Sequence, residues 1–133
     1  MNKKTNNNEL LAGTCLLLSI AKSDDKFEKS EIEIIKDIIS DFFNCDLSIL
    51  DETISIAIKK LHESTDLYEF SKVLNHSFSY QDKVDFISCT FEVAFADGTM
   101  HHLEEHFIKK IANILNVEHS DLINSKKNIQ KFL

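Results

Sequence analysis

Two pairs of acidic residues occur at matching places in the chain, and their carboxylates are the groups best suited to chemistry. Asp24 is followed seven residues later by Glu31, and Asp97 is followed seven residues later by Glu104. In each pair the Asp lies in a polar turn, and the Glu lies in the first turn of an expected helix. Carboxylate oxygens bind hard cations. The four side chains are therefore the candidate metal ligands, and the cofactor that they favour is Ca²⁺ or Mg²⁺.

Both Glu residues fall on the apolar side of their helices, which makes their charges costly. A buried carboxylate without compensation costs several kcal/mol or stays protonated. Each carboxylate therefore needs a hydrogen-bond donor or a cation nearby. On a helix with about 100° per residue, the neighbours are Ile34, Ile35 and Ile38 around Glu31, and Phe107, Ile108 and Ile111 around Glu104.

Two explanations for these carboxylates are open. In the first they cap helices, because Glu31 and Glu104 stand three residues after Glu28 and His101, as in a capping box. In the second, each Glu shares a cation with the Asp of its pair. An EF-hand is excluded, since a twelve-residue loop begun at either Asp would end at an Ile rather than at the bidentate Glu.

No catalytic motif accompanies the acidic pairs. The sequence contains no Gly-rich phosphate loop, no HExxH, no GxSxG and no Cys with a placed base. A non-catalytic module is therefore favoured. The alternative is a metal-dependent hydrolase that uses the carboxylates of Asp24, Glu31, Asp97 and Glu104 around two ions. The two hypotheses differ in whether the carboxylates share one open cleft.

A second possible metal site lies at His102 and His106, which are one helical turn apart with Glu105 beside them. This spacing can chelate a transition metal. The two His side chains point away from the apolar face of their helix, however, and no third ligand is close in sequence. A solvated helix face is the favoured interpretation.

The charge of the chain limits its partners. The net charge is −7, from 22 acidic and 15 basic residues, and no Arg is present. Without the planar guanidinium group of Arg, and with an excess of acidic residues, the chain is not expected to bind nucleic acid. Other proteins are the expected partners. The apolar run over residues 10–21 is too short for a membrane span of about twenty residues, so no membrane insertion is expected.

The three cysteines favour a reducing compartment. Cys15, Cys45 and Cys89 show neither a CxxC motif nor a zinc-ligand spacing with His. Cys15 and Cys89 lie within apolar helical patterns, where a reduced thiol behaves as a small hydrophobic group. We therefore expect free thiols and a cytoplasmic location.

The chain matches itself when it is shifted by 73 residues. The identical pairs are Ala21/Ala94, Asp24/Asp97, Glu31/Glu104, Ile35/Ile108, Lys36/Lys109 and Ile38/Ile111. Each copy contains the end of one helix, a turn and the start of the next helix. The repeat therefore predicts two helical hairpins of the same design, over residues 9–43 and 80–116.

The absence of Pro and the recurrence of apolar residues every three or four positions predict an all-α fold. About seven helices in a compact bundle are expected. Six lie near residues 9–23, 29–43, 48–62, 80–96, 102–115 and 120–131, and the fourth in the chain is a short helix that begins near Leu67 and contains Phe70, Val73 and Leu74. The first and fifth are apolar around nearly their whole circumference, which predicts central positions. Ser79 is the expected N-cap of the fifth helix. Gly13 is expected to permit a close helix crossing. Gly98 is expected to have a positive φ in the turn that follows the fifth helix.

Three segments and two glutamates of the chain resemble the TerB family. They are Ile20-Ala21-Lys22-Ser23-Asp24 with Glu31, Val93-Ala94-Phe95-Ala96-Asp97-Gly98 with Glu104, and Thr65-Asp66-Leu67-Tyr68-Glu69-Phe70. These helical domains occur in tellurite-resistance operons and at the N-terminus of the DjlA co-chaperones. Asp25 stands where Gly is usual, and Glu28 and His101 stand where Asp is common.

The resemblance covers about residues 9–131. It implies a seven-helix domain, which we assign to residues 9–133. The polar stretch over residues 1–8 is expected to be disordered. The resemblance also implies a stress-response or envelope-associated system, acidic residues suspected of binding metal, and no defined reaction.

Overall fold

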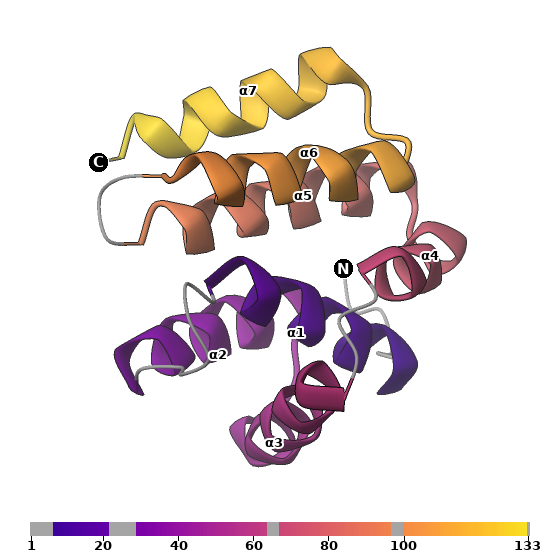
Figure 1. Cartoon of the computed structure of the whole chain (residues 1–133), viewed down its shortest axis with the longest axis vertical. Coiled ribbons are helices and arrows are strands. Elements are labelled where there is room, and N and C mark those ends of the chain that lie inside the picture. Colours follow the sequence, from indigo (N-terminus) through magenta and orange to yellow (C-terminus); the bar gives the residue numbers. More distant parts are fainter. Residues whose placement is uncertain (1–6, 22–28, 64–66, 97–99, 133) are drawn as a thin grey trace.

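The computed structural model describes residues 7–21, 29–63, 67–96 and 100–132. These ranges contain helices and no strand, which confirms the all-α prediction (Figure 1). In chain order the seven helices are α1 (Asn7–Ala21), α2 (Lys29–Phe43), α3 (Leu47–Glu63), α4 (Leu67–Ser77), α5 (Tyr80–Ala94), α6 (His102–Ile114) and α7 (His119–Gln130).

The helices begin and end at local signals in the sequence. Ser79 caps α5 as predicted, because its side-chain oxygen accepts a hydrogen bond from the Asp82 N–H at 3.2 Å. Asn116 follows the last turn of α6 with φ 60°, a left-handed conformation that Asn tolerates. The Val117 N–H then reaches back to the Ala112 carbonyl at 2.9 Å, and the Asn116 N–H to the Asn113 carbonyl at 3.2 Å. These two bonds form a Schellman motif, which ends α6 without Gly.

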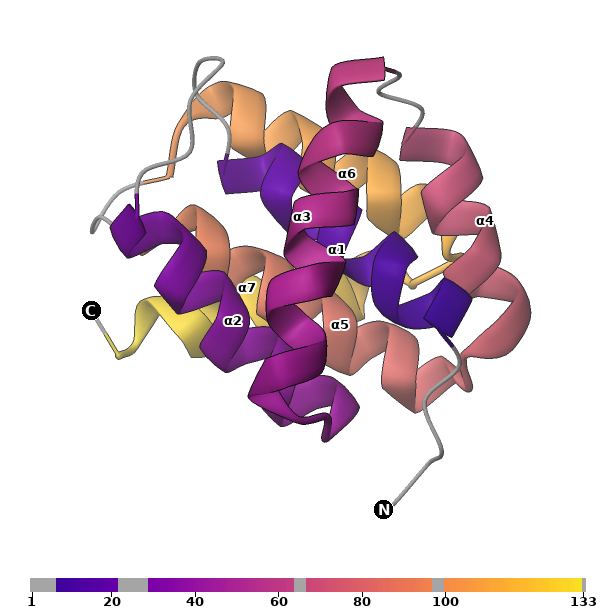
Figure 2. The ribbon, with the colours of Figure 1, turned by 90° about the horizontal axis from the view of Figure 1, so that it is seen from below.

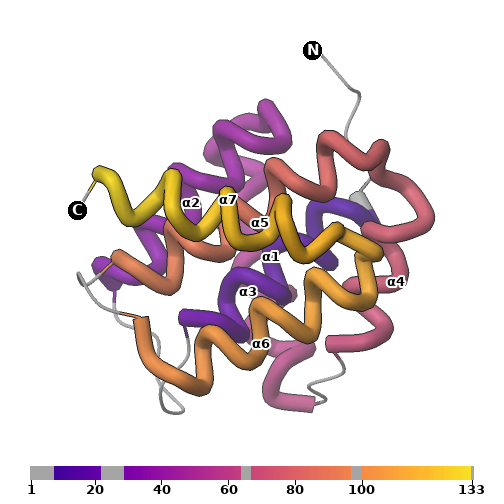
Figure 3. Tube along the Cα trace, turned by 90° about the horizontal axis from the view of Figure 1, so that it is seen from above, coloured from indigo at the N-terminus to yellow at the C-terminus, as the bar shows by residue number. Residues whose placement is uncertain are grey.

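Helix α1 is the centre of the molecule. It contacts α2, α3, α4, α5 and α6, and Figures 2 and 3 show it behind α3 from one side and behind α5 and α7 from the other. Leu17 of α1 is 1% exposed and Phe91 of α5 is 2% exposed, which confirms the prediction of two central helices. The buried hydroxyls on α1 are satisfied within the helix, because Thr14 donates to the Leu10 carbonyl and Ser19 to the Cys15 carbonyl.

Gly13 permits the close crossing that the sequence predicts. A Cβ atom added at Gly13 would lie 2.9 Å from Cζ of Phe43 and 3.3 Å from Cε1 of Phe86. Both rings belong to an aromatic cluster with Phe42 and Phe78, in which the Phe42 and Phe86 ring centroids are 5.6 Å apart. The missing side chain at Gly13 therefore lets aromatic rings of α2 and α5 contact the backbone of α1.

The cysteines are free, as the sequence predicts. Burial raises the pKa of Cys15 to about 11, and burial with nearby carboxylates raises the pKa of Cys89 to about 12. Both thiols are therefore neutral at pH 7 and pack as small apolar groups. In the part of the chain that the structure describes, no helix has the length and apolar character needed to cross a bilayer.

Candidate binding cleft between the two helical hairpins

The two predicted hairpins meet at a cleft of about 320 Å³. It lies where α1 and α5 end and α2 and α6 begin. These helix ends are on the left of Figure 1. Two pairs of residues related by the 73-residue shift contribute to its lining, Ala21 with Ala94 and Glu31 with Glu104. The cleft therefore combines equivalent positions of both repeats.

The cleft has apolar walls with a few polar groups. Ile34, Ile35 and Val93 line it beside the two Glu side chains. Ser30 and His101 are further polar lining residues, and the sequence did not single out either of them as a ligand. The sequence indicates them only by position. Ser30 directly precedes Glu31, and His101 stands three residues before Glu104.

Glu104 behaves as a capping residue of α6. It occupies the third helical position, and its Oε1 accepts a hydrogen bond from the backbone N–H of His101 at 2.9 Å. This is the half of a capping box in which the acidic side chain reaches back to the N-cap. The capping expected from the sequence is therefore confirmed for Glu104, which is partly buried and lines the cleft.

Glu31 occupies the equivalent first turn of α2 and is also partly buried. The donor equivalent to the His101 N–H would be that of Glu28, which lies outside the described residues. Capping by Glu31 therefore stays a prediction. Glu31 lines the same cleft as Glu104.

The other two predicted ligands, Asp24 and Asp97, lie outside the described residues, as does Gly98 with its predicted positive φ. Within the described ranges, no group of three or more His, Cys, Asp and Glu side chains is arranged to hold a metal ion. A complete cation site at the cleft would therefore need oxygen ligands in addition to those of Glu31 and Glu104.

The residues around His102 and His106 form the solvated face that the sequence favours. Both His side chains are exposed. Glu105 instead pairs with Lys126 of α7, whose Nζ donates to Glu105 Oε2 at 2.6 Å. This hydrogen bond is the main reason that the pKa of Glu105 is lowered. The pair connects α6 to α7.

A smaller acidic hollow of about 140 Å³ lies between α2 and α5 and was not predicted. Asp41, Asp85 and Glu92 line it together with Cys89. Burial, and then the negative charge of Asp41, raise the pKa of Glu92. Only the spacing of Asp85 and Glu92 along one face of α5 was visible in the sequence, because Asp41 comes from another helix.

A family model described as tellurite resistance protein TerB matches residues 10–127 of the chain. The chain belongs to the TerB family. The match extends from α1 into α7 and includes every described residue of the cleft. It confirms the resemblance seen in the sequence. No curated protein and no solved structure matches the chain. TerB-family domains are generally non-catalytic.

Proposed function

We propose that this TerB-family protein is a non-catalytic, cytoplasmic binding module of a tellurite-resistance or related stress system, and that its working site is the cleft between the hairpins. One observation carries the proposal. Glu31 and Glu104 occupy equivalent positions of the two repeats and line the same cleft. Two partly buried carboxylates that line one cleft supply oxygen ligands of the kind that hard cations prefer.

The cation that fits is Ca²⁺ or Mg²⁺, because the available ligands are carboxylate oxygens. Asp24 and Asp97 stand seven residues before Glu31 and Glu104 in the sequence, and they would supply the further oxygens. Glu104 can keep its bond from the His101 N–H while it binds a cation, since a carboxylate has about four lone-pair sites. A cation held by both repeats would fasten the two hairpins together.

The partners that fit the molecule are proteins with neutral or basic surfaces. The chain carries a net charge of −7 and has no Arg. An acidic surface of this kind attracts basic proteins at long range and repels nucleic acid.

Titration with Ca²⁺ or Mg²⁺ to millimolar concentration tests the cation. A ligand that binds only the native state raises the melting temperature as its concentration rises. At a concentration one hundred times the Kd, the free energy of unfolding increases by about 2.7 kcal/mol. We expect this shift in the wild type and its loss in Glu31→Gln/Glu104→Gln. Asp37→Asn is the matched control, because Asp37 is exposed on α2 and does not line the cleft. An unchanged melting temperature in the wild type, or equal shifts in both proteins, would contradict the proposal.

The shared cleft also fits the metal-dependent hydrolase, which needs its carboxylates in one place. The same proteins separate the two functions when they are incubated with a chromogenic phosphodiester and Mg²⁺. Our proposal expects no turnover above the buffer blank. Turnover that disappears in Glu31→Gln/Glu104→Gln would make the protein an enzyme.

A further inference from the structure

Helix α3 forms a ridge on the outside of the molecule, in front of α1 in Figure 2. Its buried residues are Leu50, Ile54, Ala57 and Leu61, which pack toward the core. Away from the core, Ile49 is 45% exposed and Ile56 is 43% exposed. Seven residues are about two helical turns, so these two side chains lie on one stripe of the helix.

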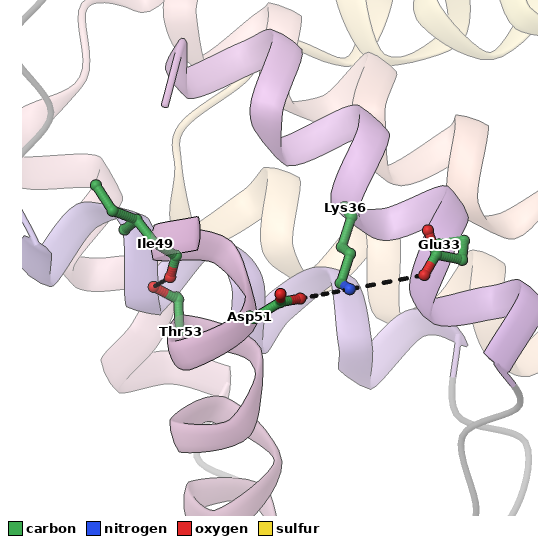
Figure 4. A network of polar contacts seen from close by, with 5 residues as sticks. All are labelled: Glu33, Lys36, Ile49, Asp51 and Thr53. Atoms are coloured by element: carbon green, nitrogen blue, oxygen red, sulfur yellow. Dashed lines mark hydrogen bonds and ion pairs between the residues drawn. The ribbon is translucent and has the colours of Figure 1, made fainter. Parts of the chain in front are cut away.

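Glu52 and Thr53 stand between the two isoleucines along this side of the helix. The Thr53 hydroxyl donates to the Ile49 carbonyl at 2.8 Å and so is satisfied within the helix (Figure 4). The polar contact between α3 and α2 lies on another side of α3, where Lys36 Nζ is 2.5 Å from Asp51 Oδ1 (Figure 4). Contact with α2 therefore does not cover the stripe.

Two opposite charges flank Ile56 at equal distances along the helix. Glu52 stands four residues before it and Lys60 four residues after it, and both are exposed. Neither takes part in an ion pair in the described chain. Ile56 is thus flanked by the acidic Glu52 on one side and by the basic Lys60 on the other.

We propose that a second copy of this chain docks on α3, with the two helices antiparallel and related by a two-fold axis at Ile56. The axis brings Ile56 against its own copy. It also brings Glu52 of each protomer opposite Lys60 of its partner. The same ion pair therefore forms twice, because a two-fold axis repeats every contact of the interface. Antiparallel helices in contact also place opposite ends of their dipoles together.

The dimer is expected to be weak. The exposed apolar side chains on the stripe are few, which places the interface at the small end of specific complexes. Two molecules of net charge −7 also repel each other at long range. At about 0.15 M salt the Debye length is about 8 Å, so this repulsion is screened while the adjacent Glu52–Lys60 pairs act.

Sedimentation equilibrium of the full chain at about 0.15 M salt, from about 10 µM to about 1 mM, tests the proposal, with a dissociation constant of roughly 0.1–1 mM expected. Ile56→Asp should abolish association. Glu52→Lys and Lys60→Glu should each weaken it about tenfold or more, because each places like charges in contact twice. The double variant Glu52→Lys/Lys60→Glu restores opposite charges and should return the constant to within about threefold of the wild type.

Lys127→Glu on α7 is the matched control, since it changes the net charge as Lys60→Glu does on a helix far from α3 (Figure 1). It should dimerise like the wild type. A wild type that stays monomeric at about 1 mM would overturn the proposal that a second copy binds α3. The exposed side of α3 would then have to bind another protein. Association that survives Ile56→Asp, or that the double swap does not restore, would overturn the antiparallel arrangement. Far-UV circular dichroism confirms that each variant is folded.

Discussion

At the scale of single residues, Glu104 combines a structural and a proposed functional role. Its Oε1 accepts the His101 N–H at the start of α6, and the same carboxylate lines the cleft. A helix start needs acceptors for its free N–H groups, and His101 is not a favoured N-cap residue. The side chain at position 104 therefore matters for the helix even without a cation.

Two substitutions at Glu104 separate these roles. Glu104→Ala removes the acceptor, and we expect it to cost about 0.5–2 kcal/mol in the free energy of unfolding. Glu104→Gln keeps an oxygen acceptor but removes the charge, so it should cost less and still weaken cation binding. Urea denaturation without divalent ions measures the free energy of unfolding of both variants. Equal losses for the two variants would mean that the charge itself, rather than the hydrogen bond, stabilises α6.

At the scale of helices, the crossing of α1 with α2 and α5 depends on Gly13. In an isolated helix Gly13→Ala would stabilise, because Gly is about 1 kcal/mol less favourable than Ala. Here the new Cβ would lie 2.9 Å from the Phe43 ring, and overpacking of this kind costs about 1–3 kcal/mol.

We therefore expect Gly13→Ala to be destabilising overall, by up to about 2 kcal/mol in a denaturant titration. Gly13→Ala combined with Phe43→Leu is the matched test. Loss of the aromatic ring removes the clash, so the two substitutions should cost less together than their separate effects add up to. A more stable Gly13→Ala protein would show that the Phe43 ring moves aside freely.

At the scale of the whole molecule, the two hairpins share one core. Helix α1 of the first hairpin contacts both α5 and α6 of the second. Phe91 is 2% exposed in α5, and Leu17 is 1% exposed in α1. Such an arrangement predicts that the hairpins unfold together in one cooperative transition.

Phe91→Ala tests this shared core. The lost ring and the cavity should cost roughly 3–5 kcal/mol, and the midpoint of unfolding should fall for both hairpins equally. Hydrogen exchange, read separately on α2 and α6, measures the two halves. Protection that falls on α6 while α2 keeps its wild-type value would show that the hairpins unfold independently.

The sequence by itself determined the helices, the repeat and the central positions of α1 and α5. These follow from local causes, because apolar periodicity and capping groups such as Ser79 act within a few residues. It also singled out Glu104, since a charge within an apolar arc must be compensated. The start of α1 and the end of α5 were less well predicted, by two residues each, because capping competes with fraying at helix ends. The predicted end of α1 at residue 23 lies outside the described residues.

Only the tertiary structure decided what the helices place together. Glu31 and Glu104 are far apart in the chain, and the packing of the hairpins brings them to one cleft. The same packing gathers Asp41 with Asp85 and Glu92 in the acidic hollow, and leaves Ile56 of α3 exposed although its helix is amphipathic. Periodicity tells which side of a helix is apolar, but the choice of neighbouring helices tells which of those side chains are covered. That choice depends on contacts between distant segments, for which a single sequence holds no local signal.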